Sequence, residues 1–342
     1  MEQPNVSLAA IEAQIAQWLQ EQPGVGNDVL IVEMMRTILK LAGDETSRGD
    51  LKILNRALKE LRHAFRVFAP YRSVRKVSIF GSTHIQEDDP YYHLTKDLAQ
   101  RLAQEGFMII TGAGPGIMQA GHEGTGREKS FGVNIRLPAA QQANRFIDGD
   151  PKLMSFHFFF TRKLMFVKEA DAVVILPGGF GTHDELMEAL TLAQTGKSQI
   201  VPIVLMDLPD REYWKEWVRF VSQAMLSRGY INGNEFSFFK IMTDIDAALG
   251  EIKTFYRTFH SYRFVKQQLV MRLNHPPAPG LIDTLNRTFA DILMAGEIRQ
   301  TEPLSEESDD PGTLHLHRLL VPFNRKDFAR LRQMIDTING ED

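Results

Sequence analysis

A glycine-rich turn at residues 177–182 carries the residue types in this sequence best suited to binding an anion. It reads Pro-Gly-Gly-Phe-Gly-Thr and separates an apolar run, residues 172–176, from residues that begin a helix. Glycines allow close backbone approach, and free N–H groups at the positive end of a helix dipole attract anions. The turn therefore predicts a phosphate site made of Gly178, Gly179, Phe180, Gly181 and Thr182. A purely structural strand-to-helix turn is the simpler interpretation of the glycines alone.

Three ionisable residues near the turn could act on a ligand bound there. Glu185 lies one helical turn after Thr182, and Arg162 and Lys163 precede it by more than 20 residues. A guanidinium can make bidentate contacts with phosphate or ribose oxygens, and Lys163 would add a second cation. The structural alternatives are a first-turn acid that complements the helix dipole, for Glu185, and the solvated face of an amphipathic helix, for the two cations.

The motif Pro-Gly-Gly-x-Gly-Thr-x-x-Glu resembles the signature of the LOG ("Lonely Guy") family of Rossmann-like phosphoribohydrolases. The resemblance extends to Phe159-Phe-Thr-Arg-Lys-Leu-Met165, where the methionine comes one position earlier than in the family's Arg-Lys-x-x-Met segment, and it spans about residues 74–244. It implies a hydrolase that cleaves the N-glycosidic bond of AMP, or of an N6-modified AMP such as a cytokinin riboside monophosphate. No cofactor is implied, and nothing marks a Schiff-base lysine of the kind that the older family label "lysine decarboxylase-like" suggests.

The resemblance also assigns roles to residues. It implies that Arg162 and Glu185 carry catalysis, that residues 179–182 hold the 5′-phosphate and that Thr191 contacts the substrate. It places at the floor of the same crevice Gly81, Ser82, Gly112, Gly114, Gly116 and Met118. The sequence departs from the family at Leu137-Pro-Ala-Ala140-Gln141, because many relatives have Leu-Pro-x-Glu-Gln. Ala140 thus replaces an acidic residue, and the preferred base is left undefined.

Cleavage of an N-glycosidic bond makes one clear chemical demand. The transition state has oxocarbenium character on the ribose, so the catalyst needs negative charge or a water-directing carboxylate near the anomeric carbon. Glu185 meets that demand, and Arg162 can hold the substrate against it.

The order of elements predicts an α/β fold with a Rossmann-like, doubly wound parallel sheet. Strand-like runs at residues 77–80, 107–111, 131–137, 172–176 and 200–205 alternate with helical segments, and ligands of such sheets bind beyond the carboxyl ends of the strands. We expect residues 71–259 to form this domain and residues 1–70 to form a helical extension, with helices at 8–19, 29–42 and 51–68. The second of these helices is apolar on much of its surface, so it should pack against the core domain or a second subunit.

Residues 260–342 are expected to form a small C-terminal α+β module. The patterns predict helices at 265–273, 281–298 and 325–335, a strand at 313–320 and a mobile acidic loop at 302–312.

Composition limits the partners. A net charge of -4 leaves no basic field for a nucleic-acid polymer, and no apolar run reaches the roughly 18 residues of a membrane span. The absence of cysteine excludes disulfides, Cys-ligated zinc and thiol nucleophiles. We expect a cytoplasmic protein that binds a small molecule, and the family resemblance implies a homodimer or higher homo-oligomer.

Other residues and functions receive less support. His315 and His317 share one face of a predicted strand, but no third metal ligand is apparent. His183 is expected to have no chemical role, and Phe158, Phe159 and Phe160 should be mostly core, although one could stack on a base. A protein that binds a nucleotide or phosphorylated cofactor without turnover is the main alternative function. An NAD enzyme is disfavoured, because residues 112–118 do not complete the Gly-x-Gly-x-x-Gly spacing.

Overall fold

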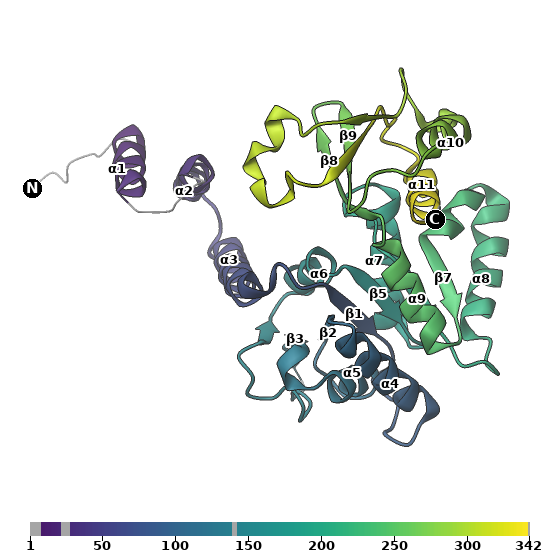
Figure 1. The fold of residues 1–342 in the computed structure, drawn as a ribbon. Coiled ribbons are helices and arrows are strands. Elements are labelled where there is room, and N and C mark those ends of the chain that lie inside the picture. The colour runs from purple at the N-terminus through teal and green to yellow at the C-terminus, as the bar shows by residue number, and fades with distance from the viewer. Residues whose placement is uncertain (1–7, 22–27, 139–141, 341–342) are drawn as a thin grey trace, which may run out of the picture. The chain divides into compact units, whose positions relative to one another are not determined.

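The computed structural model describes residues 8–21, 28–138 and 142–340 (Figure 1). The chain forms two units, residues 1–61 and 62–342. The first unit contains α1 (Leu8–Gln20), α2 (Asp28–Gly43) and most of α3 (Arg48–Phe68), which confirms the three predicted helices. Arg36 of α2 pairs with Glu12 of α1 at 2.7 Å.

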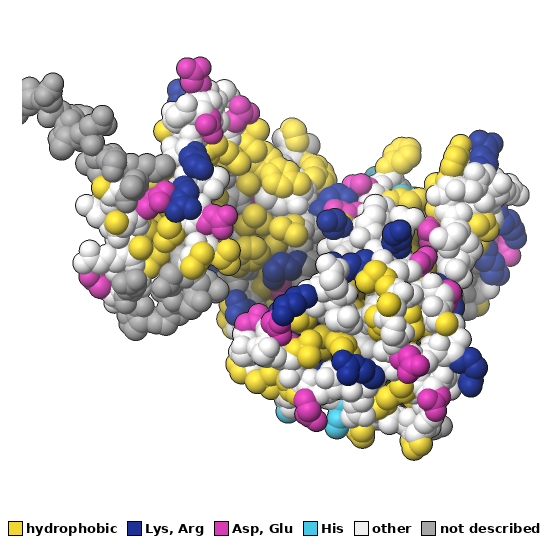
Figure 2. All heavy atoms as spheres, turned by 90° about the horizontal axis from the view of Figure 1, so that it is seen from above, with side chains coloured by type: hydrophobic (Ala, Val, Ile, Leu, Met, Phe, Trp, Pro, Cys, Tyr) yellow, Lys and Arg dark blue, Asp and Glu magenta, His cyan; other side chains and the backbone are white. Residues whose placement is uncertain are grey.

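The surface carries charges of both signs. On the face seen in Figure 2, Lys and Arg side chains are scattered among Asp and Glu side chains and do not gather into one basic field. None of the helices in the described ranges has the length and apolar character needed to cross a membrane.

A seven-stranded parallel sheet forms the centre of the second unit and confirms the predicted Rossmann-like α/β class. Its strand order is β4-β3-β2-β1-β5-β6-β7. The strands are β1 (Lys76–Phe80), β2 (Met108–Thr111), β3 (Ser130–Ile135), β4 (Leu153–Phe156), β5 (Ala172–Ile175), β6 (Ile203–Met206) and β7 (Phe239–Met242), and the connecting helices are α4 (Pro90–Gln104), α5 (Ile117–Thr125), α6 (Phe159–Lys168), α7 (Phe180–Gln194), α8 (Tyr213–Ala224) and α9 (Ile245–Phe255). The sequence patterns did not predict β4, a strand of four residues at the edge of the sheet.

The order in which the chain adds strands to the sheet reverses between β1 and β5. The chain adds β2, β3 and β4 on one side of β1, then returns to place β5 on the other side. Ligands of doubly wound sheets bind at such a switch point, beyond the carboxyl ends of the strands. Here those ends lead into Gly81 and into the Pro177 turn, and the two loops are joined by a hydrogen bond from the Ser82 N–H to the Pro177 carbonyl at 3.1 Å.

The C-terminal residues build a second, antiparallel sheet of four strands in the order β10-β11-β9-β8. Its elements are β8 (Phe259–Val265), β9 (Gln268–Leu273), α10 (Leu281–Thr288), β10 (Arg299–Thr301), β11 (His317–Val321) and α11 (Phe328–Gly340). The predicted helix at 265–273 is wrong, because these residues turn at Lys266, with φ of 53°, and form a β-hairpin. A short apolar run such as residues 269–273 does not reveal its period, so helix and strand cannot be told apart there. The predicted helix at 281–298 ends early, at Thr288.

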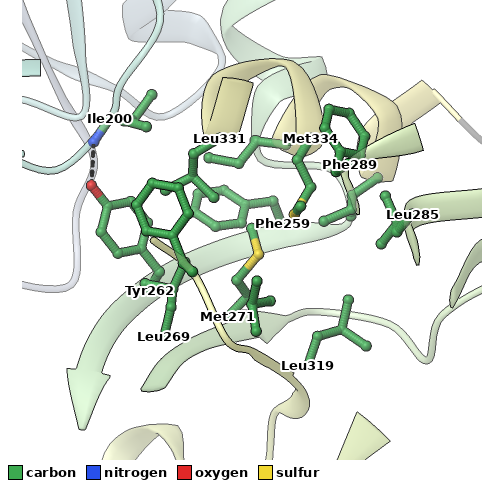
Figure 3. Packing of buried hydrophobic residues seen from close by; sticks show 14 of the residues in the cluster. Ile200, Phe259, Tyr262, Leu269, Met271, Leu285, Phe289, Leu319, Leu331 and Met334 are labelled. Atoms are coloured by element: carbon green, nitrogen blue, oxygen red, sulfur yellow. Dashed lines mark hydrogen bonds between the residues drawn. The ribbon is translucent and has the colours of Figure 1, made fainter. Parts of the chain in front are cut away.

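One hydrophobic core joins the two sheets' elements. Figure 3 shows Phe259, Tyr262 and Met271 of the antiparallel sheet packed with Leu331 and Met334 of α11, and the cluster also includes Ala193, Ile200, Phe238 and Phe255. The Tyr262 hydroxyl accepts a hydrogen bond from the Ile200 N–H at 3.3 Å. The core is therefore continuous across residue 259, and the domain boundary expected there stays a prediction.

The acidic segment 302–312 is anchored, contrary to the expectation of a mobile loop. It contains a 3₁₀ helix, Ser305–Asp309, and Glu307 is fully buried between two arginines. The Glu307 carboxylate lies 2.8 Å from Arg272 Nη2 and 2.9 Å from Arg318 Nε. The sequence did not reveal this role of Glu307, because an acidic loop has the same composition whether its carboxylates are solvated or paired with arginines.

Removing the charge of Glu307 should destabilise the fold. In Glu307→Gln the buried Arg318 loses its paired carboxylate and Arg272 keeps only Asp310, at 2.8 Å, and breaking a buried pair costs about 3–5 kcal/mol of unfolding free energy. Urea unfolding measures this loss. The matched control is Glu306→Gln at the neighbouring solvent-exposed carboxylate, which pairs with Lys266 and should change stability little. Equal midpoints for Glu307→Gln and wild type would contradict this account of the loop.

Candidate active site

A cavity of about 380 Å³ opens beyond the carboxyl ends of β1, β2 and β5, beside the start of α7. It contains most of the residues that the sequence predicted for the site. Those that line it are Gly81, Ser82, Gly112, Met118, Arg162, Gly179, Phe180, Gly181, Thr182 and Glu185. Segments separated by more than 100 residues in the sequence thus meet at one place, as the switch point requires.

The glycine turn presents backbone donors to this cavity. Helix α7 begins at Phe180, and the N–H groups of Thr182 and His183 bond to the Gly179 carbonyl at 3.0 and 3.1 Å. Within the described ranges, the N–H groups of Gly179, Phe180 and Gly181 have no hydrogen-bond partner in the protein. Such N–H groups at a helix start form an anion site.

Each glycine of the turn has its own geometry. A Cβ at Gly178 would lie 2.1 Å from Thr182 Oγ1, so only glycine fits there. A Cβ at Gly179 or Gly181 would meet nothing within 4 Å, which leaves room for a ligand to approach the backbone. Phe180 between them is 97% exposed. Gly178 therefore shapes the turn, and the other two glycines keep its cavity side open.

Arg162 and Glu185 form an ion pair at the wall of the cavity. Arg162 Nη2 lies 3.2 Å from Glu185 Oε1, and the two side chains are 14% and 7% exposed. The guanidinium carbon lies 4.9 Å from the ring centre of Phe159 and 5.5 Å from that of Phe166. Among the described residues, buried Arg162 Nε has no hydrogen-bond partner. The guanidinium therefore keeps one buried donor that the described residues leave unpaired.

Burial sets the ionisation of this pair. It raises the pKa of the Glu185 carboxyl, although Lys163 and Arg162 oppose the shift. It lowers the pKa of the Arg162 guanidinium, against the attraction of Glu185. A carboxylate held in this setting carries a charge that is poorly hydrated and can stabilise a nearby cation.

Lys163 lies outside the cavity lining. Its Nζ contacts three carboxylates on the first turns of α7, at 3.0 Å from Asp184, 3.6 Å from Glu185 and 2.9 Å from Glu188. Burial alone would lower the pKa of Lys163, but hydrogen bonds to Glu188 and Asp184 outweigh it and raise that pKa. Lys163 thus neutralises the acidic start of α7 and contacts Glu185 Oε2, whereas Arg162 contacts Oε1.

The glycine loop after β2 divides into lining and supporting residues. Gly112 lines the cavity, and a Cβ there would lie 2.6 Å from Met118 Sδ. Gly114 and Gly116 do not line it. Gly116 has φ of 68° and fits against the Ser82 carbonyl, whereas the Gly114 carbonyl accepts a hydrogen bond from Asn144 Nδ2 at 3.0 Å.

A buried histidine supports this loop and was missed in the sequence. His122 of α5 is fully buried, with Nε2 3.0 Å from Thr111 Oγ1 and Nδ1 3.1 Å from Asn144 Nδ2. Burial lowers the pKa of His122 to about 4, so the ring is neutral at physiological pH. Thr111 also accepts a hydrogen bond from the Ala113 N–H. A lone His in an amphipathic helix gives no signal of such a network.

Several individual residues lie elsewhere than the sequence suggested. Thr191 lies outside the cavity and lines a separate apolar cavity of about 180 Å³ with Trp217 and Phe236. Phe159 and Phe160 are 50% and 56% exposed and are not core. Ala140 and Gln141 lie outside the described residues.

The histidines also differ from expectation. His315 precedes β11, so it does not share a strand face with His317. In the part of the chain that the structure describes, no three His, Asp or Glu side chains are grouped to hold a metal ion. His84, which was not predicted from the sequence, also lines the cavity, and its place two residues after Ser82 at the end of β1 was the available signal.

Comparison with known proteins finds similarity over the part of the chain that holds the cavity. A family model described as "Possible lysine decarboxylase" matches residues 115–252. The probable cytokinin riboside 5′-monophosphate phosphoribohydrolase LOG6 of Arabidopsis thaliana is 29% identical over 163 residues, 46% of this chain and 77% of that protein. The resemblance to the LOG family is confirmed. The cytokinin riboside 5′-monophosphate phosphoribohydrolase of Rhodococcoides fascians is 30% identical over 106 residues, 31% of this chain and 52% of that protein.

Solved structures give a weaker likeness. The molybdenum cofactor binding protein from Rippkaea orientalis is 17% identical with a TM-score of 0.36, covering 53% of this chain and 96% of that one. The molybdenum cofactor carrier protein from Chlamydomonas reinhardtii is 16% identical with the same TM-score and the same coverage. Likeness at this level does not identify a function.

Proposed function

We propose that this protein is a hydrolase that cleaves the N-glycosidic bond of a nucleoside 5′-monophosphate, AMP or an N6-modified AMP, to free base and ribose 5-phosphate. The observation that carries the proposal is the buried Arg162–Glu185 pair beside unpaired N–H groups at the start of α7. The plant and bacterial relatives named as phosphoribohydrolases support the reaction class.

We assign a part of the proposed reaction to each group. The N–H groups of residues 179–181 would hold the 5′-phosphate. The Glu185 carboxylate would stabilise the oxocarbenium-like ribose and accept a proton from the attacking water. Arg162, which lines the cavity, would use its guanidinium to orient the ribose.

The proposed hydrolysis needs no co-reactant other than water. The bond between the anomeric carbon and the base nitrogen breaks, and its electron pair stays with the base, which takes a proton from solvent. The water oxygen bonds to the anomeric carbon, and its proton passes to Glu185 and then to solvent.

A protein that binds a nucleotide or phosphorylated cofactor without turnover is the alternative. It would use the same N–H groups, but a carboxylate beside a bound phosphate opposes binding. The presence of Glu185 in the cavity wall therefore favours the enzyme.

From the family resemblance we propose further properties. The protein would act in the cytoplasm as a homodimer or higher homo-oligomer, with residues 1–70 and 260–342 as additions to the catalytic domain. Size-exclusion chromatography with light scattering measures the assembly.

The 5′-phosphate should be required for activity. A nucleoside leaves the N–H groups of residues 179–181 and the Thr182 hydroxyl without a partner, so AMP should exceed adenosine in kcat/KM by at least about 100-fold. Chromatography of the released adenine measures both rates. Similar rates for AMP and adenosine would show that the glycine turn is structural and that the phosphate does not bind there.

A further inference from the structure

His183 and Tyr213 form a hydrogen-bonded chain to the glycine turn. The Tyr213 hydroxyl, on the first residue of α8, lies 2.5 Å from the Gly178 carbonyl oxygen. His183 Nε2 lies 2.8 Å from the same hydroxyl. A tyrosine hydroxyl has a single proton, which it must donate to the carbonyl because the carbonyl can only accept. Tyr213 therefore accepts from His183, and the imidazole carries its proton on Nε2.

The two rings are held firmly. His183 and Tyr213 both pack against Trp214, with ring centres 5.8 and 4.9 Å away, and Trp214 is fully buried. The Trp214 indole N–H donates to the Met206 carbonyl at 3.1 Å, which ties α8 to the end of β6. Burial lowers the pKa of His183, which favours the neutral ring.

The bond to Gly178 has a consequence for the next residue. The Gly178 carbonyl and the Gly179 N–H belong to one planar trans peptide, so they point in opposite directions. When Tyr213 fixes the carbonyl on the α8 side, it also fixes the Gly179 N–H on the other side. Gly179 lines the cavity, and its N–H has no partner among the described residues.

We propose that Tyr213, supported by His183, is a positioning residue that aims the Gly179 N–H at the 5′-phosphate of the substrate. This inference rests on the proposed function. It gives His183 a task that its place in the motif did not suggest, since His183 acts on the ligand only through Tyr213.

The test measures phosphate affinity after removal of one hydroxyl. In Tyr213→Phe the peptide is no longer held, so the dissociation constant of ribose 5-phosphate, measured by calorimetry, should rise about tenfold. The KM for AMP should rise by a similar factor, and kcat should change less than about threefold, because Tyr213 lies outside the cavity wall that carries Glu185.

A double-mutant cycle separates positioning from general stability. His183→Gln alone should weaken ribose 5-phosphate binding about threefold, and it should add nothing in the Tyr213→Phe background, because His183 works through the hydroxyl. The matched control is Tyr91→Phe, which removes a hydroxyl bonded to Asp207 at 2.6 Å outside the cavity lining. That control should lower the melting temperature and leave ribose 5-phosphate affinity unchanged.

The outcomes are distinct from those of the proposed function. Wild-type affinity in Tyr213→Phe, additive losses in the cycle, or an equal loss in Tyr91→Phe would each overturn the positioning role. A wild-type protein that binds ribose 5-phosphate but releases no base contradicts the proposed function, and the binding comparison still decides the role of Tyr213. A wild-type protein that binds neither ribose 5-phosphate nor AMP contradicts both. If Tyr213→Phe does not fold, the His183→Gln variant tests the positioning role by itself. An unchanged affinity of that variant for ribose 5-phosphate would reject the proposal.

Discussion

Glu185→Gln is expected to lower kcat by about 10³-fold or more and to leave AMP binding intact or tighter. The amide keeps the shape of the side chain but removes the charge that stabilises the oxocarbenium-like state. It also removes the repulsion between the carboxylate and the phosphate, which is why binding should not weaken. Single-turnover kinetics and calorimetry measure the two effects separately.

The control for this variant lies one turn further along α7. Glu188 is also bound to Lys163, at 2.9 Å, but it does not line the cavity, so Glu188→Gln should keep near wild-type turnover. Full activity in Glu185→Gln would remove this residue from the mechanism.

The pH dependence follows from the burial of Glu185. Its raised pKa means that the carboxylate forms only above the ordinary range of a glutamate. Activity should therefore be lost as pH falls, with the acid limb of kcat/KM above that ordinary range.

Arg162→Ala is expected to lower kcat/KM by about 10³-fold, with losses in both affinity and rate. The guanidinium is proposed to hold the ribose and to lie against Glu185, so its loss removes the contacts that align the reacting atoms. Arg162→Lys should recover little, because an ammonium cannot make the planar, bidentate contacts. Steady-state kinetics of both variants measure this difference.

Arg162→Ala carries a second signature. The positive charge of Arg162 lowers the pKa of Glu185, so its removal should move the acid limb of the pH profile to higher pH. Arg145→Ala is the control, because Arg145 is exposed and pairs with Glu87 outside the cavity lining. Near-full activity in Arg162→Lys would contradict the bidentate role.

The parallel sheet was predictable because most of its strands have a clear sequence pattern. β1, β2 and β5 are short, buried and mostly apolar; Gly81 and Gly112 follow the first two directly, Leu176-Pro177-Gly178 follows β5, and a helix comes after each. The hairpin of β8 and β9 was missed because its signal is a single positive φ at Lys266, a residue that gives no sequence cue for a turn. A turn whose conformation is set by tertiary contacts cannot be recognised from the local sequence pattern.

The candidate site was predictable as a set of motifs but not as a geometry. The sequence motifs contain Arg162, Glu185 and the glycine turn, and the fold brings them to one cavity. Spacing alone could not show that Lys163 turns away to the acidic side chains of α7, or that Thr191 faces another cavity. Those outcomes depend on the rotation of α6 and α7 about their axes, which packing fixes.

The continuous core and the buried ion pairs of the C-terminal residues lay beyond sequence reasoning for a different reason. Glu307 sits in a segment rich in acidic residues, and its two arginines come from β9 and β11. Only the pairing of strands that are distant in sequence brings these charges together. A composition rule that treats acidic loops as mobile fails wherever such partners exist.

Product analysis of the wild-type protein with a panel of nucleoside 5′-monophosphates tests the central claim most directly. Chromatography should show free base and ribose 5-phosphate appearing in equal amounts from AMP or another member of the panel, and the Glu185→Gln protein should yield neither. Recovery of every nucleotide intact, while calorimetry shows that one of them binds, would contradict the hydrolase and identify a protein that holds its ligand without turning it over.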